Sequence, residues 1–415
     1  MTYTFSDVIG FGGGFALGMT QAGFDLRAKR EILNFGIKNC EANRQLLGYN
    51  WDAQVKPLSR EPEWDIVQTD VVTGNPPCSG FSTLTNAAYR GENAAINDCM
   101  WAFASYVGKA RPQIAAFESV QHAGKMGRGL MNELRDYVEK TTGLQYELHH
   151  VMHNALSCGG PANRPRYFWL VSQIPFGVEY PIPDLIPSTM DVIGDLRGMS
   201  MTWEKQPYRY PETWWSSRRR SHDGAVDGHI TRHLTHGKRI HALLDALDGE
   251  WPQGWREEDA VRKIYERDGK LPDIWKSQEE RLVRRNFDMG FNQLQRWYGD
   301  RPARVITGAA LSQAMHPTEN RLFTNREAAR IQGFPDSWRL WPMREYASLG
   351  KTFGKGIPVD AGRWLGYWIK NALDGNPGTM SGTPIGEREH LIQADKGFKQ
   401  TQQRGGRRKH EFWAV

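Results

Sequence analysis

The sequence predicts an α/β protein in which a doubly wound, Rossmann-like sheet carries a smaller inserted domain. Near the start of the chain, an apolar strand leads into a glycine-rich turn and a helix-like run, which is the order of a nucleotide-type binding unit. Further short apolar runs end in turns or in single polar groups, as strands of such a sheet do. A stretch of different composition interrupts this pattern. At 415 residues the chain is long enough for two domains.

The domain boundaries are placed where the composition changes. Residues 1–173 and 302–374 carry the sheet pattern, and residues 174–301, rich in Trp and in basic residues, form the inserted domain. Residues 375–415 have little apolar periodicity and end in a basic run, which predicts a flexible tail suited to nonspecific attraction of polyanions.

The first strand, turn and helix form the predicted ligand-binding turn. In the glycine turn after the strand Tyr3 to Ile9, missing side chains let the backbone approach a ligand at a helix N-terminus. A second strand is expected to end at Glu31, where an acid can hydrogen-bond ribose hydroxyls. Glycine also serves ordinary tight turns, so the turn alone is weak evidence. The residues assigned to this site are Asp7, Gly10, Phe11, Gly12, Gly13, Gly14, Glu31, Ile32, Asn75 and Pro76.

A cysteine follows the next predicted strand, Asp70 to Gly74, on a stiff Pro-Pro turn. Cys78 therefore lies at the carboxyl end of a strand, where open α/β sheets bind ligands. A thiol becomes a strong nucleophile when nearby positive charge or a helix N-terminus lowers its pKa. An isolated cysteine is more often buried and inert, so this interpretation depends on the neighbours of Cys78.

Two later segments supply chemically suitable neighbours. The apolar run Ile114 to Val120 carries Glu118, a carboxyl group that burial can turn into a proton donor near neutral pH. Taken alone, it could equally be a solvated glutamate at the start of a loop. Arg164 and Arg166 alternate on one face of a predicted strand, and guanidinium forks suit phosphate, carbonyl or carboxylate groups.

The composition indicates an intracellular protein with a polyanionic partner. Lys and Arg number 53 against 47 Asp and Glu, and the pI is about 9.0. The four cysteines form no C-x-x-C pair, so neither a disulfide framework nor a structural zinc site is indicated. No apolar stretch approaches the roughly 20 residues of a membrane helix, and no signal-peptide pattern opens the chain, so a cytoplasmic location is expected. Four histidines lack flanking Cys or carboxylate ligands, so we expect no metal; they are His222, His229, His233 and His236.

Taken in order, these segments resemble the cytosine-C5 DNA methyltransferase family over roughly 1–172 and 302–372. The matching motifs are Asp7 to Phe24, the Pro-Pro-Cys loop, Phe117 to Val120, Arg164-x-Arg166, Leu322 to Asp336, and Gly354 to Val359. Six ordered motifs are far beyond chance. The chain departs from the family pattern with Ile9 for Phe, Phe11 for Gly, Ser119 for Asn, Ala162 for Gln, Lys355 for Asn and Gly356 for Ser.

The resemblance implies covalent catalysis on a cytosine flipped out of the duplex. Cys78 would add to ring C6, and Glu118 would protonate ring N3. Arg166 and Arg164 would steady the ring carbonyl and hold Cys78 in its anionic form. The activated C5 would then take a carbon from the sulfonium of S-adenosylmethionine, and elimination of Cys78 would release the product.

The resemblance also implies that the inserted domain reads double-stranded DNA. The residues predicted to contact DNA are Ser82, Arg218, Arg219, Arg220, Arg284 and Arg285. In the alternative interpretation, the Trp residues form a small core and the Arg runs are solvated faces; both can hold together. We expect a monomer in a bacterial or phage-infected cell, without a membrane.

Lys355 bears on the donor, because the resemblance puts it beside the group to be transferred. A cation about 4 Å from a sulfonium would be repelled by roughly 4 kcal/mol at an effective dielectric near 20. A donor with a carboxylate on its transferable carbon, carboxy-S-adenosylmethionine, would instead form an ion pair, and Gly356 makes room for it. We therefore favour transfer of a carboxymethyl group, giving 5-carboxymethylcytosine. In the alternative, Lys355 points to solvent or to a phosphate, and ordinary S-adenosylmethionine is the donor.

Two other classes of function stay open at this point. A tRNA cytosine methyltransferase would share the catalytic groups, but the inserted domain of roughly 130 residues suits DNA better. A catalytically inactive binding protein is disfavoured, because the nucleophile, the acid and both arginines are present.

Overall fold

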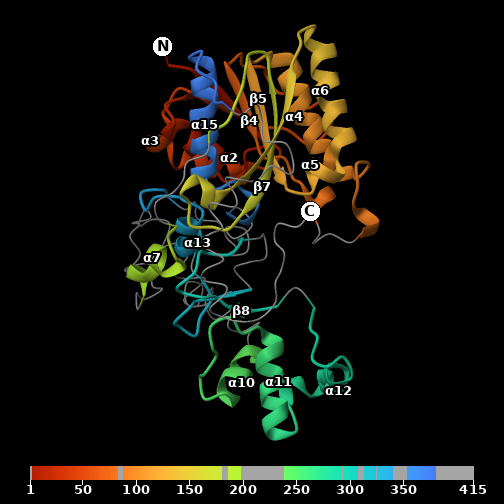
Figure 1. The fold of residues 1–415 in the computed structure, drawn as a ribbon, viewed down its shortest axis with the longest axis vertical. Coiled ribbons are helices and arrows are strands. Elements are labelled where there is room, and N and C mark those ends of the chain that lie inside the picture. Colours follow the sequence, from red (N-terminus) through yellow and green to blue (C-terminus); the bar gives the residue numbers. More distant parts are fainter. Residues whose placement is uncertain are drawn as a thin grey trace, which may run out of the picture.

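The computed structural model describes residues 2–82, 87–179, 186–197, 238–290, 293–306, 313–323, 325–339 and 353–379. Its centre is a seven-stranded mixed sheet with the order β3-β2-β1-β4-β5-β7-β6 (Figure 1). Strands β1 to β5 are parallel to one another, and β7 is antiparallel to both of its neighbours. The strands are β1 (Thr4–Val8), β2 (Asp25–Glu31), β3 (Asp52–Val55), β4 (Val71–Gly74), β5 (Ile114–Val120), β6 (Glu147–Asn154) and β7 (Pro165–Ser172).

This architecture confirms the predicted α/β fold class, and the strand ends lie where the sequence predicts them. The second strand ends at Glu31, and the strand that carries Glu118 spans the predicted Ile114 to Val120. The central strands β4 and β5 are buried almost throughout, because helices cover both faces of a doubly wound sheet.

Helices cover the two faces of the sheet (Figure 1). One face carries α1 and α15 and the other carries α4 and α6, each pair with its own apolar cluster. The helices of this part are α1 (Gly14–Gln21), α2 (Asn34–Glu41), α3 (Arg44–Leu47), α4 (Asp98–Ala110), α5 (Ala123–Met126), α6 (Arg128–Thr142), α13 (Asn325–Ile331) and α15 (Val359–Leu373).

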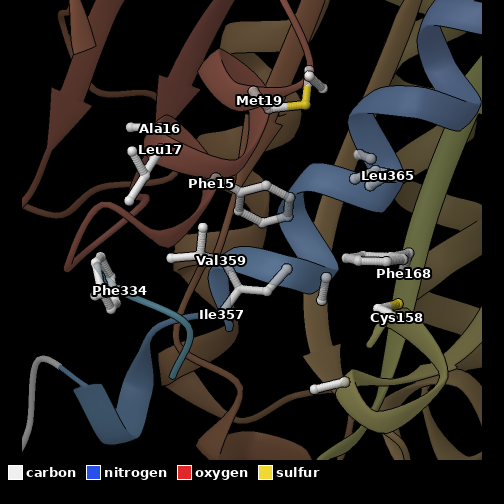
Figure 2. Close-up of a cluster of buried hydrophobic side chains, with 14 of the residues drawn as sticks. Phe15, Ala16, Leu17, Met19, Cys158, Phe168, Phe334, Ile357, Val359 and Leu365 are labelled. Carbon is white, nitrogen blue, oxygen red and sulfur yellow. The ribbon is translucent and has the colours of Figure 1, made fainter. Parts of the chain in front are cut away.

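Helix α15, near the end of the described chain, packs against α1 near its beginning. Phe15 of α1 projects toward α15, which carries Leu365 (Figure 2). The ring of Phe15 also lies 6.1 Å from that of Phe168 in β7. A Cβ added at Gly14 would fall 2.0 Å from the carbonyl oxygen of Ile357, so only glycine allows this approach.

The described part of the inserted domain is mainly helical. It contains α7 (Thr189–Ile193), α10 (Lys238–Ala246), α11 (Glu257–Asp268) and α12 (Lys276–Arg284), followed by the short strand β8 (Gln295–Arg296), which pairs with β9 (Ala314–Met315). Helices α10 to α12 share a separate core that includes Trp251 and Trp275, and Figure 1 shows them grouped away from the large sheet. The expected Trp core is therefore present. No helix within the described ranges is both long and apolar enough to cross a membrane.

Candidate active site

The sheet brings the predicted chemical groups to one edge. Strands β1, β4 and β5 are adjacent and parallel, so the glycine turn, the Cys78 loop and Glu118 all lie at or near their carboxyl ends. Because β7 is antiparallel to β5, its first residues lie at the same edge, and Arg166 pairs with Val120. This is the edge at which open α/β sheets bind ligands.

Glu118 is buried and held by polar groups from two directions. The side-chain amide of Asn75 donates a 2.6 Å hydrogen bond to Oε2, and Nε of Arg166 lies 3.1 Å from Oε1. Within the described part of the chain, Oε1 accepts no hydrogen bond. Burial raises the pKa of Glu118, as predicted, while Arg166, Arg164 and Asn75 pull it down. The Glu118 carboxyl group is therefore suited to carry a proton, and its Oε1 atom is the oxygen suited to deliver that proton.

Cys78 lies four residues beyond β4 and precedes the short 3-10 helix Ser79–Phe81. Cys78 is half-buried as a residue, whereas the other three cysteines are buried. Burial raises the pKa of Cys78 and so does the charge of Glu118; Arg166, the amide of Val120 and Arg164 lower it. The two arginines thus favour the thiolate as expected, but burial and Glu118 outweigh them.

Arg164 and Arg166 both approach Glu118, but they donate hydrogen bonds to different groups. The Nε atom of Arg164 lies 3.8 Å from Glu118 Oε1. The remaining nitrogens of Arg164 donate to the carbonyl oxygens of Ile306, Gly354 and Gly356, all from the returning part of the chain. Arg164 thereby joins the carboxylate to the segment that carries Lys355.

The glycine turn has an unusual backbone. Two residues that are not glycine, Ile9 and Phe11, have positive φ angles of 55° and 53°, in the left-handed region that favours glycine. A Cβ at Gly10 would fall 2.1 Å from the carboxylate oxygens of Asp7. The amide of Phe11 donates a 2.7 Å hydrogen bond to Oε1 of Glu31, and its ring lies edge-on to that of Phe35.

A buried lysine that the sequence analysis does not identify lies under this turn. The ammonium of Lys29 is 2.7 Å from Oδ2 of Asp7 and 3.1 Å from Oε1 of Glu31, and all three side chains are at most 1% exposed. The available signal was the charged triplet Lys29-Arg30-Glu31 at the end of the predicted second strand, since charges on a strand that helices cover must find partners.

Lys355 reaches the glycine turn from the returning part of the chain. It is exposed and lies in the helical turn 353–355. Its Nζ is 5.5 Å from the centroid of the Phe11 ring, which is within the range of a cation–π contact.

The remaining predicted residues are distributed as follows. Pro76 is buried and Ile32 is half-buried in the same apolar cluster as Phe11, and the carbonyl of Gly12 accepts from Asn39. Ser82 directly follows the 3-10 helix after Cys78. Arg284 and Arg285 are exposed at the end of α12, far along the chain from the catalytic groups. Arg218, Arg219, Arg220 and the four predicted non-ligand histidines lie outside the described residues. Among the residues that the structure describes, no cluster of His, Cys, Asp or Glu is arranged to hold a metal.

Comparison with known proteins relates most of the chain to one family. The model of the family described as C-5 cytosine-specific DNA methylase matches residues 3–371. The type II methyltransferase M.AgeI of Thalassovita gelatinovora is 25% identical over 368 residues, covering 74% of this chain and 84% of the relative. The type II methyltransferase M.XorII of Xanthomonas oryzae pv. oryzae is 23% identical over 390 residues, covering 89% and 85%.

Solved structures show a similar fold. A protein encoded within an E. coli prophage, described as a DNA modification methyltransferase, superposes with a TM-score of 0.52 at 15% identity, covering 90% of this chain and 100% of that one. A methyltransferase of Entamoeba histolytica superposes with a TM-score of 0.50 at 12% identity, covering 90% and 99%. At such identities the likeness concerns the fold.

Proposed function

This chain belongs to the C-5 cytosine-specific DNA methylase family, and we propose that it transfers a methyl group from S-adenosylmethionine to C5 of a flipped-out cytosine in duplex DNA. The observation that carries the proposal is the buried Glu118 carboxyl group, held by Asn75 and Arg166 at the sheet edge that also carries Cys78. A nucleophile, a proton donor and a cation then meet at one place, as addition to an electron-poor ring requires.

The residues divide the chemistry between them. Cytosine C5 is a weak nucleophile, so the Cys78 thiol first gives its proton to water and the sulfur then adds to C6. Glu118 gives a proton to N3, which offsets the negative charge that this attack pushes into the ring. Arg166 favours the thiolate over the buried thiol. After C5 is alkylated, water takes the C5 proton, the Cys78 sulfur leaves C6, and N3 returns its proton to Glu118, which restores the aromatic ring.

The glycine turn is suited to hold the donor. The turn precedes the N-terminus of α1 and is too tight at Gly10 for a side chain, and Glu31 is buried beside it. We assign Asp7, Gly10 to Gly14 and Glu31 to donor binding, with Ile32 and Pro76 as apolar neighbours. The bound donor would supply an electrophilic carbon on a sulfonium.

A covalent trap tests the nucleophile. DNA that carries 5-fluorocytosine should leave a denaturant-resistant adduct on the intact enzyme, because fluorine cannot leave as the C5 proton does. Cys78→Ala should form no adduct and transfer nothing, since it lacks the attacking sulfur. Cys158→Ala, which removes a buried cysteine, is the matched control and should still form the adduct. Turnover by the Cys78→Ala protein would reject the assignment.

A second donor is supported by one observation, the position of Lys355 at the glycine turn. The family relationship supports S-adenosylmethionine, so methyl transfer, which the sequence analysis places second, is now the better supported activity. Carboxymethyl transfer stays a proposal that depends on the Lys355 ammonium meeting a donor carboxylate.

A competition between the two donors separates these activities. If Lys355 pairs with a carboxylate, Lys355→Asn should weaken transfer from carboxy-S-adenosylmethionine by about 1.5–3 kcal/mol, the range for losing a hydrogen bond to a charged group. Transfer from S-adenosylmethionine should stay equal or improve, because a repulsive charge has gone. Mass spectrometry of nucleosides after reaction with both donors measures the outcome, and Lys370→Asn, an exposed lysine on α15, is the control. Methylcytosine as the sole product of both proteins would leave ordinary methyl transfer.

The residues that contact nucleic acid are also part of this proposal. Arg284 and Arg285 are exposed at the end of α12, which suits phosphate contact, and Ser82 and Arg218 to Arg220 are assigned to DNA from the sequence. Replacing Arg284 by Ala should weaken binding to all duplex sequences alike and reduce the salt dependence of the affinity. Turnover on tRNA in place of duplex DNA would favour the tRNA alternative.

A further inference from the structure

We propose that Lys29 is a positioning residue of the donor site, which favours the ionised form of the Glu31 carboxylate and aims it at the Phe11 amide and at the ribose of the donor. The inference rests on the proposed function, because it requires a donor at the glycine turn. It assigns a role to a buried cation that the catalytic steps do not use.

The geometry places Lys29 between two acids on one face of the sheet. Lys29 on β2 is in register with Asp7 on the adjacent strand β1, and Glu31 follows two residues later on the same face. The ammonium lies 2.7 Å from Asp7 Oδ2 and 3.1 Å from Glu31 Oε1, with no side-chain exposure of its own. A buried carboxylate with so close a cation keeps its charge more readily than one without.

Glu31 connects Lys29 to the glycine turn. The same Oε1 atom that meets Lys29 accepts the 2.7 Å hydrogen bond from the amide of Phe11. Phe11 has a left-handed backbone although it is not glycine, so its conformation needs support from outside the turn. A charged acceptor gives a stronger hydrogen bond than a neutral one, both to this amide and to ribose hydroxyls.

The charges around Glu31 shift its pKa in opposite directions and by different amounts. Burial raises the pKa of Glu31 to about 7; among the charges, Lys29 lowers it most and Asp7 raises it less. Cys40 on α2 also neighbours the cluster, but burial raises the pKa of its thiol to about 12, so it is neutral. The exposed ammonium of Lys355 reaches the Phe11 ring from the returning segment. Removing Lys29 or Asp7 should therefore change the ionisation of Glu31 in opposite directions.

Binding of S-adenosylhomocysteine measured by calorimetry from pH 5.5 to 9 tests this inference. This ligand lacks the transferable carbon, so the result does not depend on which donor is used. In the wild type, affinity should increase as the pH rises through about 7, because Glu31 then becomes the charged acceptor. In Lys29→Met the midpoint should move up by roughly one pH unit or more, which weakens binding on the order of tenfold at neutral pH. In Asp7→Asn the midpoint should move down.

Two controls keep a structural effect separate from an electrostatic one. Glu31→Gln should remove the pH dependence. Arg30→Met removes a buried cation from the same strand, one that pairs with Asp52 and the carbonyl of Asp65, and should leave the midpoint unchanged. If Lys29→Met does not fold, the double variant Asp7→Asn with Lys29→Met removes both charges, and its midpoint should still lie above that of the wild type.

The outcomes separate this inference from the proposed function. If the wild type binds and its midpoint is retained in both Lys29→Met and Asp7→Asn, or if Lys29→Met loses the same affinity at every pH, the role of Lys29 is overturned and the donor site stands. Failure of the folded wild-type protein to bind S-adenosylhomocysteine at any pH would overturn both.

Discussion

At the scale of single residues, burial and nearby positive charge shift the pKa values of the catalytic groups in opposite directions. Burial raises the pKa of both Cys78 and Glu118, and Arg166 is the largest opposing charge for each. The two groups need opposite states, since one must lose a proton and the other must deliver one. A single guanidinium beside the carboxylate limits both shifts, and it also links the two titrations because Glu118 itself raises the pKa of the thiol.

Replacing Glu118 by Gln tests the proton donor. The amide keeps the shape and can still meet Asn75, but it cannot supply a proton, so the rate of transfer should fall by roughly 100-fold to 10,000-fold. Stopped-flow or single-turnover measurement of product gives the rate, and DNA binding should change little. A loss of DNA affinity as large as the loss of rate would make Glu118 a structural residue instead.

At the scale of elements, the strands and their ends were predictable, and the contacts between distant segments were not. An apolar run that carries one acid marks β5 and places Glu118 near its end. The end of β2 at Glu31 was predicted from its distance beyond the glycine turn and the first helix. Lys29 was missed because a lysine ordinarily indicates a solvated face, and its partner Asp7 lies on another strand.

The hydrogen bonds of Arg164 could not be predicted for the same reason. Its acceptors lie 142 to 192 residues away in the chain, on segments whose approach depends on the packing of the whole domain. The predicted alternation of Arg164 and Arg166 on one face does agree with their shared approach to Glu118. Three of the six residues assigned to DNA contact, Arg218 to Arg220, lie outside the described residues.

The close packing of α1 on α15 gives a prediction at this scale. Gly14→Ala would put a Cβ 2.0 Å from the backbone oxygen of Ile357, which cannot turn aside as a side chain can. We expect a loss of about 1–3 kcal/mol or more in the free energy of unfolding, measured in urea. Gly129→Ala, on the exposed side of α6, meets the end of the Glu92 side chain, which accepts a hydrogen bond from the Leu130 amide but can turn aside, so this change should cost clearly less. Equal effects of the two changes would contradict this account of the packing.

At the scale of the whole molecule, the first and last described segments of the chain pack against each other. Helix α15 packs on α1, Tyr3 donates a hydrogen bond to Asp374, and the indole of Trp368 donates to the carbonyl of Glu179. Residues from both halves of the chain therefore build one core, and the insertion between them leaves and re-enters it. Helix α15 is therefore part of the core that carries the sheet, and we propose a separate role for the basic sequence that follows it.

Truncation on the two sides of this boundary tests that division. Ending the chain after Thr379 removes Arg404, Arg407, Arg408 and Lys409 but keeps α15, so the melting temperature and transfer at low salt should be preserved. Affinity for nonspecific duplex DNA should fall, and its dependence on salt should become shallower by up to about 0.9 for each phosphate that the removed residues neutralise. Ending the chain after Pro358 also removes α15, and should abolish cooperative folding because the apolar face of α1 loses its cover. An unchanged salt slope in the first truncation would show that the basic residues near the C-terminus do not contact DNA, whatever the second truncation does to the fold.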